Sequence, residues 1–385
     1  MNQEDRDVLL EKVRALKPAI GARAAETEAL RRPHDETMRE LAEAGVMHMF
    51  TPRRWGGSEA DIATMLEVVE EISSGCMSTG WIAAFYIGHN LLMAKFPVKA
   101  QEEMFREKGY CLAPAASSPT MSARKVDGGY VISGRAPWGT GVMHADWVMV
   151  SGLVEAEGPR CFVLPISDVR VDDVWFYTGM PGTGSNDIVA EEAFVPEYRT
   201  LSALEFRSGA TQGSSIHENP LFSAPFVALA YCEIVGVFSG GLRGMAEAFG
   251  QIVEARVRNF TGAVSRDLPQ VQIALGEAKL SATIAGELSR VQAERTAAII
   301  GRRDFTLDDR IGLRAHAAFI AQHCRSAANE MIGRAGASNF AVQAPIQRFF
   351  RDINMLANHA FWDWDASREL LGRHHLGLPP NNPLV

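Results

Sequence analysis

The sequence of 385 residues predicts a mostly α-helical protein with a central β-domain. Three observations predict this fold class: apolar residues at helical spacing in the first part, short β-like runs in the middle, and long helical segments in the last part. We therefore expect an N-terminal helical domain over residues 1–110, a β-barrel or β-sandwich over residues 111–205, and a C-terminal four-helix bundle over residues 206–385.

The N-terminal part consists of helical stretches joined by loops. Residues 4–48 are rich in Leu, Ala, Glu and Arg at helical spacing, with one interruption at Arg32-Pro33. Residues 51–61 are typical of a loop, and apolar helical stretches then continue to Phe96.

Two apolar stretches, residues 80–96 and 222–241, approach the length of a membrane span. The first contains His89 and the second contains Glu233, and neither polar residue suits a lipid-facing helix. We interpret both stretches as buried core helices and expect no membrane partner.

The middle of the chain has the pattern of a β-domain. Residues 125–135 predict a hairpin, because a turn at Gly128-Gly129 is followed by alternating apolar residues. Further short β-like runs, separated by turn residues, occupy residues 145–154, 160–166, 168–177 and 193–199.

The last part predicts a bundle. A polar segment, residues 207–220, forms the bridge to it. From Ala224 to about Leu371 the apolar spacing predicts four long helices. The expected breaks between them lie near Gly262, near Gly301 and between Gly336 and Pro345.

Composition and charge exclude several classes of function. The formal net charge of −8 argues against nucleic acid as a partner, because phosphate binding requires a basic face. The five cysteines are scattered without a CxxC pair, so we expect neither a disulfide framework nor a zinc site. The first residues are charged and helical, unlike a signal peptide, and a cytoplasmic protein is expected.

Common catalytic motifs are missing from the sequence. It contains no GxGxxG after a strand, no GxxxxGK[ST] and no GxSxG, which disfavours the Rossmann, P-loop and α/β-hydrolase classes. None of the ten histidines has a glutamate three residues before it, so a di-iron centre in the bundle is not supported. We expect no catalytic metal.

Five segments, spread over nearly the whole chain, match patterns of one protein family in the same order as in that family. They are TPRRWGGSEAD at 51–61, VDGGYVISGRAPWGTG at 126–141, GMPGTGSNDIVAEEAFVPEYR at 179–199, ARVRNFTG at 255–262 and QRFFRDINM at 347–355. Together they resemble the acyl-CoA dehydrogenase superfamily. The second segment is similar to its Gly-Gly-Tyr hallmark, in which a small hydroxyl residue approaches the flavin. The resemblance implies that the chain has the fold of that superfamily.

One departure from the dehydrogenase pattern concerns the catalytic base. A glutamate commonly follows the Arg-Asp pair in the dehydrogenases, whereas the same spacing from Arg351 reaches Ala360 in this sequence. Without a carboxylate there, abstraction of an α-proton from a thioester has no base. His359 stands next to that position, and an Arg-Asp pair followed by histidine resembles the flavin-dependent monooxygenase branch.

Two further segments carry the same resemblance. PWGTGVMHADW at 137–147 is similar to a signature of the monooxygenases, with Thr140 in place of the usual serine. GWIAAFYIGHN at 80–90 is similar to their helix with a substrate-pocket histidine, here His89. The branch includes p-hydroxyphenylacetate hydroxylase oxygenases and aromatic hydroxylases of steroid, polyketide and indole pathways.

The resemblance implies an oxygenase component of a two-component flavin monooxygenase. Its co-substrates would be O₂ and a diffusible reduced flavin, FMN or FAD, made by a separate flavin reductase. Its substrate would be a small aromatic molecule, and the enzyme would be a homo-oligomer, a tetramer. Three alternatives stay open: an acyl-CoA dehydrogenase, an N-oxygenase of an amine or amino sugar on the same fold, and a relative without flavin.

The candidate catalytic residues are His359, Thr140 and His89. His359 is expected on an apolar helix with a pKa near neutrality, either to hydrogen-bond the oxygenating group or to deprotonate a phenol. Thr140 is expected to turn its hydroxyl and its backbone N–H toward the flavin. His89 is expected in a substrate pocket with Tyr86 and Trp81. By local pattern alone, a histidine in such surroundings is usually a hydrogen-bonded core residue.

The candidate flavin contacts share small, hydroxyl or basic side chains and follow from the resemblance: Trp138, Thr140, Gly141, Ser117, Ser118, Arg258 and Ser338. Ser117 and Ser118 are expected in a flavin-facing loop. Arg258 is expected to meet the flavin phosphates of a neighbouring subunit, because a guanidinium binds phosphate through paired donors. Ser338 is expected at a helix start that offers backbone N–H groups to a phosphate.

Overall fold

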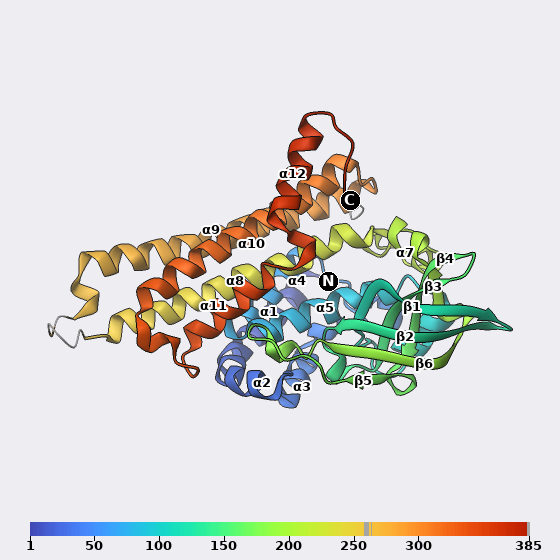
Figure 1. Cartoon of the computed structure of the whole chain (residues 1–385), viewed down its shortest axis with the longest axis horizontal. Coiled ribbons are helices and arrows are strands. Elements are labelled where there is room, and N and C mark those ends of the chain that lie inside the picture. Colours follow the sequence, from blue (N-terminus) through green and yellow to red (C-terminus); the bar gives the residue numbers. More distant parts are fainter. Residues whose placement is uncertain (258–261, 263, 383–385) are drawn as a thin grey trace.

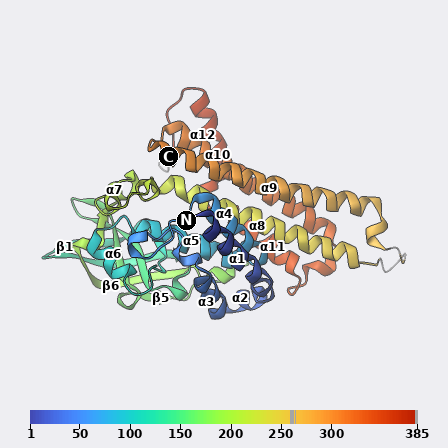
Figure 2. The ribbon, with the colours of Figure 1, turned by 180° about the vertical axis from the view of Figure 1, so that it is seen from behind.

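The computed structural model describes residues 1–257, 262 and 264–382, apart from the side chains of residues 227 and 228. Figure 1 shows short N-terminal helices, a sheet on one side of them and long helices that extend away on the other side. The view from behind shows the same arrangement (Figure 2). The predicted order of helices, strands and helices is confirmed, and the boundaries at residues 110 and 205 stay a prediction.

Six α-helices form the N-terminal part: α1 (Gln3–Ala22), α2 (Ala24–Leu30), α3 (Asp35–Ala44), α4 (Ile62–Gly75), α5 (Met77–Met93) and α6 (Val98–Phe105). The predicted interruption at Arg32-Pro33 separates α2 from α3, and a second break lies at Arg23. Every residue of α5 except Phe85 is buried, as expected for a helix that is apolar on all sides. Within the described ranges, we find no helix long and apolar enough to cross a membrane.

The β-domain is one mixed sheet of seven strands in the order β5-β6-β2-β1-β3-β4-β7. The strands are β1 (Ala115–Val126), β2 (Gly129–Gly139), β3 (Trp147–Val154), β4 (Gly158–Pro165), β5 (Arg170–Asp172), β6 (Asn186–Pro196) and β7 (Thr200–Ser202). β1 and β2 form the predicted hairpin, and its turn includes Gly128 with φ of +75°. β2 lies between β1 and β6: β1 pairs with Gly129–Gly134, whereas β6 pairs along β2 as far as Gly139.

Among the described residues, six α-helices follow the sheet: α7 (Ala203–Ser208), α8 (Phe226–Ala255), α9 (Pro269–Arg302), α10 (Leu307–Ala335), α11 (Pro345–Leu356) and α12 (Trp364–His375). The last helix of the predicted bundle is therefore shorter than expected, and the chain turns after Leu356. The carbonyl oxygen of Leu356 accepts a bond from the Trp362 indole at 2.8 Å and another from the His359 N–H at 3.1 Å. These bonds replace those of a continuing helix, so α11 and α12 are separate elements.

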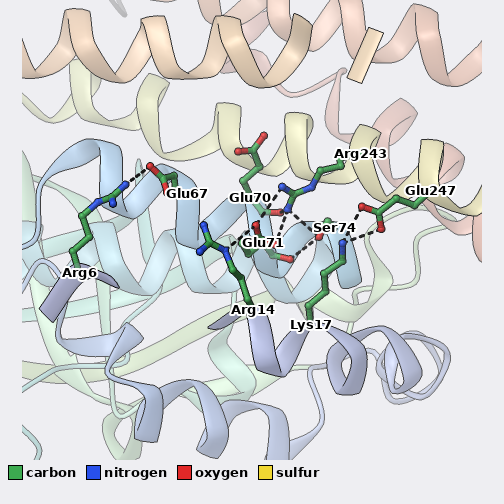
Figure 3. A network of polar contacts seen from close by, with 9 residues as sticks. All are labelled: Arg6, Arg14, Lys17, Glu67, Glu70, Glu71, Ser74, Arg243 and Glu247. Atoms are coloured by element: carbon green, nitrogen blue, oxygen red, sulfur yellow. Dashed lines mark hydrogen bonds and ion pairs between the residues drawn. The ribbon is translucent and has the colours of Figure 1, made fainter. Parts of the chain in front are cut away.

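The N-terminal helices and the bundle share one apolar core, and the sheet has a second core of its own. α8 carries Gly240 where it crosses α4, and a Cβ at that position would overlap the carbonyl oxygen of Glu70. Figure 3 shows the polar contacts beside this crossing. Arg243 of α8 pairs with Glu71 at 2.9 Å, and Lys17 of α1 pairs with Glu247 at 2.8 Å. Close backbone packing and these pairs fix α1, α4 and α8 relative to one another.

Lys95 fastens the polar segment between the sheet and the bundle. Its buried ammonium donates to the carbonyl oxygens of Gly209 at 2.7 Å, Phe222 at 3.1 Å and Ala224 at 2.8 Å. Three acceptors satisfy the three donors of a lysine. Burial lowers the pKa of Lys95 to about 7. The segment that the sequence marked only as a bridge is thus held against the helical core.

Glu233 places a second ionisable group inside the core. Its carboxyl on α8 lies against Gly88 of α5, where a Cβ would overlap it. Burial raises the pKa of Glu233 to about 8. No residue of the described ranges donates a hydrogen bond to this carboxyl, so the neutral form is favoured at pH 7.

Glu233→Gln should remove a pH-dependent loss of stability. The unfolded chain releases the Glu233 proton near its usual pKa of 4.5, whereas the folded chain holds it to about pH 8. The free energy of unfolding therefore falls as pH rises between these values, by at most about 1.4 kcal/mol per pH unit. Urea denaturation of both proteins from pH 5 to pH 8 should show that the free energy of unfolding of the variant increases relative to that of the wild type as pH rises.

Glu254→Gln, an exposed position on the same helix, is the matched control and should leave this pH dependence unchanged. A difference between Glu233→Gln and the wild type that stays constant with pH would contradict the interpretation.

Candidate active site

A tight turn after β2 places Thr140 next to α5. Trp138 adopts a left-handed backbone conformation with φ of +63°, uncommon for a residue other than glycine, and is 64% exposed. The Thr140 N–H donates to the Trp138 carbonyl oxygen at 2.8 Å. The expectation that this N–H faces the flavin is therefore wrong. The hydroxyl is the polar group that Thr140 can offer to a ligand.

Gly141 is held by protein groups on every side. Its N–H donates to the Thr183 carbonyl oxygen at 3.1 Å, and its carbonyl oxygen accepts from the Tyr86 hydroxyl. Its φ is +79°, and a Cβ would lie 2.9 Å from the Tyr86 oxygen, so glycine is required. Burial raises the pKa of Tyr86 well above its usual value of 10. These contacts fix the turn, and the expected contacts of Gly141 with flavin and of Tyr86 with substrate stay a prediction.

Three buried hydroxyls form a row that begins at Thr140. The oxygens of Thr140 and Ser185 are 3.0 Å apart, and those of Ser185 and Thr183 are 2.8 Å apart. Thr183 donates to the carbonyl oxygen of Met180 at 2.9 Å. The Trp81 indole N–H approaches the Thr140 oxygen at 3.5 Å. The row connects the turn after β2 with the segment that precedes β6.

The Arg-Asp pair of α11 anchors the far end of this row. The Met180 N–H donates to the buried Asp352 carboxyl at 2.6 Å. Arg351 donates to the carbonyl oxygen of Thr178 and, at 2.6 Å, to Glu28 of α2. Burial raises the pKa of Asp352 to about 7. One pair of residues thus joins α2, α11 and the segment before β6.

In the sequence, Arg351 and Asp352 were identified only as part of a family pattern. Their role in anchoring the segment before β6 was not predicted. A signal was present, because Asp352 lies on the apolar face that Phe349, Ile353 and Leu356 give to α11. A carboxyl on such a face requires a buried donor. The sequence could not name that donor, since it lies 172 residues earlier in the chain.

Aromatic rings connect Thr140 with His359. The Trp81 ring lies 6.0 Å from the His359 ring and 4.6 Å from Phe85, the residue of α5 that is not buried. Trp362 stacks on His359 at 4.6 Å with an angle of 19° between the planes. The structure therefore brings together three of the predicted site residues, Thr140, Trp81 and His359.

His359 differs from its predicted setting in two ways. It lies beyond the end of α11 as the cap of a 3-10 turn, because its Nδ1 accepts the Phe361 N–H at 3.3 Å. Neighbouring rings displace water and lower its pKa to about 4, although part of the residue is exposed. The expected pKa near neutrality is therefore not found. With Nδ1 as the acceptor, the neutral ring carries its proton on Nε2 and is a hydrogen-bond donor.

His89 has the opposite arrangement. Its ring is buried, and the Nδ1 lies 2.6 Å from the Ala113 carbonyl oxygen. A carbonyl only accepts, so the proton of the neutral ring is on Nδ1 and Nε2 is an unprotonated acceptor. Burial lowers the pKa of His89 to about 4. The ring also meets Phe85 edge-on at 5.0 Å, which places it on the same face of α5 as the aromatic cluster.

Ser117 and Ser118 lie in β1 and not in a loop. The pairing of β1 with β3 shifts register between Ala116 and Pro119, so the two serines form an irregular stretch of strand. Ser117 is half-buried and Ser118 is exposed. Such bulges redirect side chains and are frequent next to active sites.

Of the two expected phosphate contacts, the structure describes Ser338. Ser338 is exposed in a 3-10 turn of four residues, Ala337–Phe340, and not at the start of a longer helix. This turn joins α10 to α11 at the end of the bundle remote from the sheet (Figure 1). Arg258 lies outside the described residues. Arg256, two residues earlier, donates to the Ala335 carbonyl oxygen at 3.0 Å, so Arg256 lies close to the turn that contains Ser338.

The residues around Thr140 fit a flavin ring. That ring system is flat and largely apolar, with N–H groups and carbonyl oxygens on its edges. The exposed Trp138 offers an aromatic surface, the Thr140 oxygen an acceptor, and the His359 Nε2–H a donor. This set suits the reactive end of the cofactor, and the Ser338 turn with its neighbouring arginine suits the phosphate end.

Comparison with family models gives two matches. Residues 3–107 match the model described as acyl-CoA dehydrogenase, N-terminal domain, and residues 234–364 match the model of the C-terminal domain. A "Pigment production hydroxylase" of Rhodococcus sp. (strain ATCC 21145) is 39% identical over 386 residues, with 99% of each chain covered. The "Flavin-dependent monooxygenase, oxygenase subunit HsaA" of Mycobacterium tuberculosis is 30% identical, with 100% of this chain and 99% of the relative covered.

Solved structures agree with these matches. The crystal structure of the HsaA monooxygenase from M. tuberculosis superposes with a TM-score of 0.91 at 28% identity, covering 99% of this chain and 100% of that one. XiaF from Streptomyces sp., in complex with FADH₂ and glycerol, also gives a TM-score of 0.91 at 28% identity, covering 99% and 98%.

Asp352→Ala should destabilise the protein by about 1–3 kcal/mol, the cost of leaving a buried donor without its acceptor. The donor is the Met180 N–H, and its loss should also loosen the hydroxyl row. Asp352→Asn keeps an oxygen at the same place and should lose less than half as much. Urea denaturation at pH 7 measures both. If the alanine variant were as stable as the wild type, Asp352 would not be the anchor described here.

Proposed function

This chain belongs to the acyl-CoA dehydrogenase family, among the oxygenase components of two-component flavin-dependent monooxygenases, and we propose that its substrate is a phenol. The observation that carries this proposal is the opposite hydrogen bonding of the Nδ1 atoms of two histidines near the aromatic cluster, from which their protonation follows. His89 has an unprotonated Nε2, whereas His359 has a protonated one. A phenol that is being hydroxylated needs both an acceptor for its own proton and a donor toward the incoming oxygen.

His89 would accept the phenol proton or hold it in a hydrogen bond. Its Nδ1–H is fixed on the Ala113 carbonyl, so the ring cannot rotate without losing a buried bond. Its pKa of about 4 means that the ring is neutral and able to accept at pH 7. Two relatives whose names state a phenolic substrate support this choice. They are a resorcinol hydroxylase of Rhizobium sp. and a p-hydroxyphenylacetate 3-hydroxylase of Acinetobacter baumannii.

His359 would donate its Nε2–H to the oxygen that is transferred. When bound, the reduced flavin activates O₂ and supplies that oxygen to the substrate. Trp362 and Trp81 lie against the His359 ring from two sides and orient it. Thr140 would meet the flavin edge, and Trp138 would cover its ring, so both remain proposed flavin contacts.

The reduced flavin is expected to come from another protein. Relatives are named as oxygenase subunits or components, which implies a separate flavin reductase. We leave both FMN and FAD as candidates, with FADH₂ supported by the name of the resorcinol hydroxylase and by the bound FADH₂ of XiaF. A cytoplasmic location is part of the proposal, supported by five cysteines that are all buried free thiols.

A second copy of the chain would complete the flavin site. Thr140 lies beside α5, whereas the Ser338 turn joins α10 to α11 at the end of the bundle remote from the sheet (Figure 1), so we expect a flavin that meets both to span two subunits. α9 offers a surface for the contact. Apolar residues repeat at intervals of seven and four along one exposed face: Ile273, Leu280, Ile284 and Val291. We propose a homotetramer in which α9 is buried between copies.

A direct test supplies photochemically reduced FMN or FAD and O₂ to the purified chain with resorcinol, p-hydroxyphenylacetate or indole-3-acetate. We expect product from a phenol. His359→Ala should lower product formation by about 10²- to 10⁴-fold and raise the share of H₂O₂, while flavin binding persists. If the ratio of product to H₂O₂ stays that of the wild type in a destabilised variant, His359 is a core residue only.

His89→Ala serves as the contrasting variant. Its rate should recover as pH rises toward the phenol pKa of about 10, because an ionised substrate no longer needs an acceptor for its proton. His359→Ala should show no such recovery. Equal pH profiles for the two variants would rule out the division of roles.

Leu280→Glu combined with Ile284→Glu should reduce the assembly state, because two charges would be buried on the proposed interface. Sedimentation velocity at micromolar concentration should show a smaller species than the wild type. Leu204→Glu is the control, since Leu204 is an exposed apolar residue of α7, away from α9. A monomeric wild type of 42.0 kDa would remove the basis of the two-subunit site.

A further inference from the structure

The row of hydroxyls at Thr140 has a fixed direction. Thr183 donates to the Met180 carbonyl oxygen, which can only accept. The Thr183 proton is thereby used, so the 2.8 Å contact with Ser185 is a bond donated by Ser185. The Ser185 proton is then used as well, and the 3.0 Å contact with Thr140 is a bond donated by Thr140. Every proton in the row points away from the Thr140 end.

The Met180 carbonyl is a firm end point. It also accepts the Trp175 indole N–H at 3.0 Å and the Thr183 backbone N–H at 3.2 Å, so three donors converge on one oxygen. The residue itself is held by Asp352 through its N–H. Because all three hydroxyls are buried, no bulk water competes to reverse the row.

The consequence for Thr140 concerns its role toward a ligand. A threonine hydroxyl has one proton and two lone pairs. Here the proton is directed to Ser185, and one lone pair faces the Trp81 indole N–H at 3.5 Å. The remaining lone pair makes Thr140 a hydrogen-bond acceptor and not a donor.

We propose that Ser185 and Thr183 are positioning residues that keep Thr140 an acceptor and so make the site prefer reduced over oxidised flavin. The preference follows from the chemistry of the flavin N5, which carries a hydrogen in the reduced form and a lone pair in the oxidised form. An acceptor matches the first and repels the second. The inference rests on the proposed function, in which Thr140 meets the flavin edge.

The test measures binding and not turnover. Anaerobic calorimetry gives the Kd of reduced FMN and of reduced FAD, and aerobic calorimetry gives the Kd of the oxidised forms. In Ser185→Ala the Thr140 hydroxyl loses its acceptor and is free to turn its proton outward. We expect the ratio of oxidised to reduced Kd to fall by about tenfold, the effect of one hydrogen bond. Thr183→Val cuts the row one residue further on and should lower the same ratio.

Two variants act as controls. Thr183→Ser retains the hydroxyl and should keep the wild-type ratio, which a merely structural role of the side chain would not predict. Ser133→Ala removes a half-buried serine that bonds Glu192 in the same sheet, and should leave the ratio unchanged. Melting temperatures of all variants identify any loss of fold.

An unchanged ratio in folded Ser185→Ala and Thr183→Val would overturn the proposal. That failure is distinct from failure of the proposed function. If the wild type binds neither form of FMN or FAD and hydroxylates no phenol, the proposed function fails. If it binds reduced flavin and yields product while the ratio is insensitive to the row, only the positioning role is lost.

Discussion

The site depends on the hydrogen bond from the Met180 N–H to the buried carboxyl of Asp352. It joins the bundle to the segment before β6, and Arg351 extends the junction to Glu28 of the N-terminal helices. The hydroxyls that reach Thr140 start from the same residue, Met180. A shift of α11 would therefore move the polar group expected to meet the flavin. Three regions of the chain, distant in sequence, form one rigid site because a single buried carboxyl requires a partner.

Burial shifts the pKa values of several ionisable groups of this protein toward their neutral forms. Asp352 and Glu233 have pKa values raised to about 7 and about 8, and Lys95 has one lowered to about 7, each mainly because of desolvation. His89 and His359 are kept neutral by the same effect. A neutral imidazole has one donor and one acceptor, so the backbone group that it meets decides its role. The backbone partner of Nδ1 thus makes one histidine a donor and the other an acceptor.

Much of the fold was predictable from local pattern. The hairpin at Gly128, the core character of residues 80–96 and the breaks between the bundle helices follow from turn chemistry and apolar spacing. The turn after Leu356 was not predictable, because the Trp362 indole competes for a backbone carbonyl of α11. The bulge at Ser117 and Ser118 likewise depends on the pairing of β1 with β3, which one strand cannot specify.

The sequence by itself determined the family, the order of the three regions and the residue types at the site, because periodicity and short motifs are local. Only the tertiary structure decided what those residues do. In the folded chain the Thr140 N–H donates to the Trp138 carbonyl oxygen, and the Gly141 carbonyl oxygen accepts from Tyr86. The carboxyl of Asp352 accepts from the Met180 N–H. The tertiary structure also set the protonated nitrogen of each histidine. Hydrogen bonds and desolvation act between groups that are far apart in the chain, so the direction of a proton and the pKa of a buried group exist only once the chain has folded.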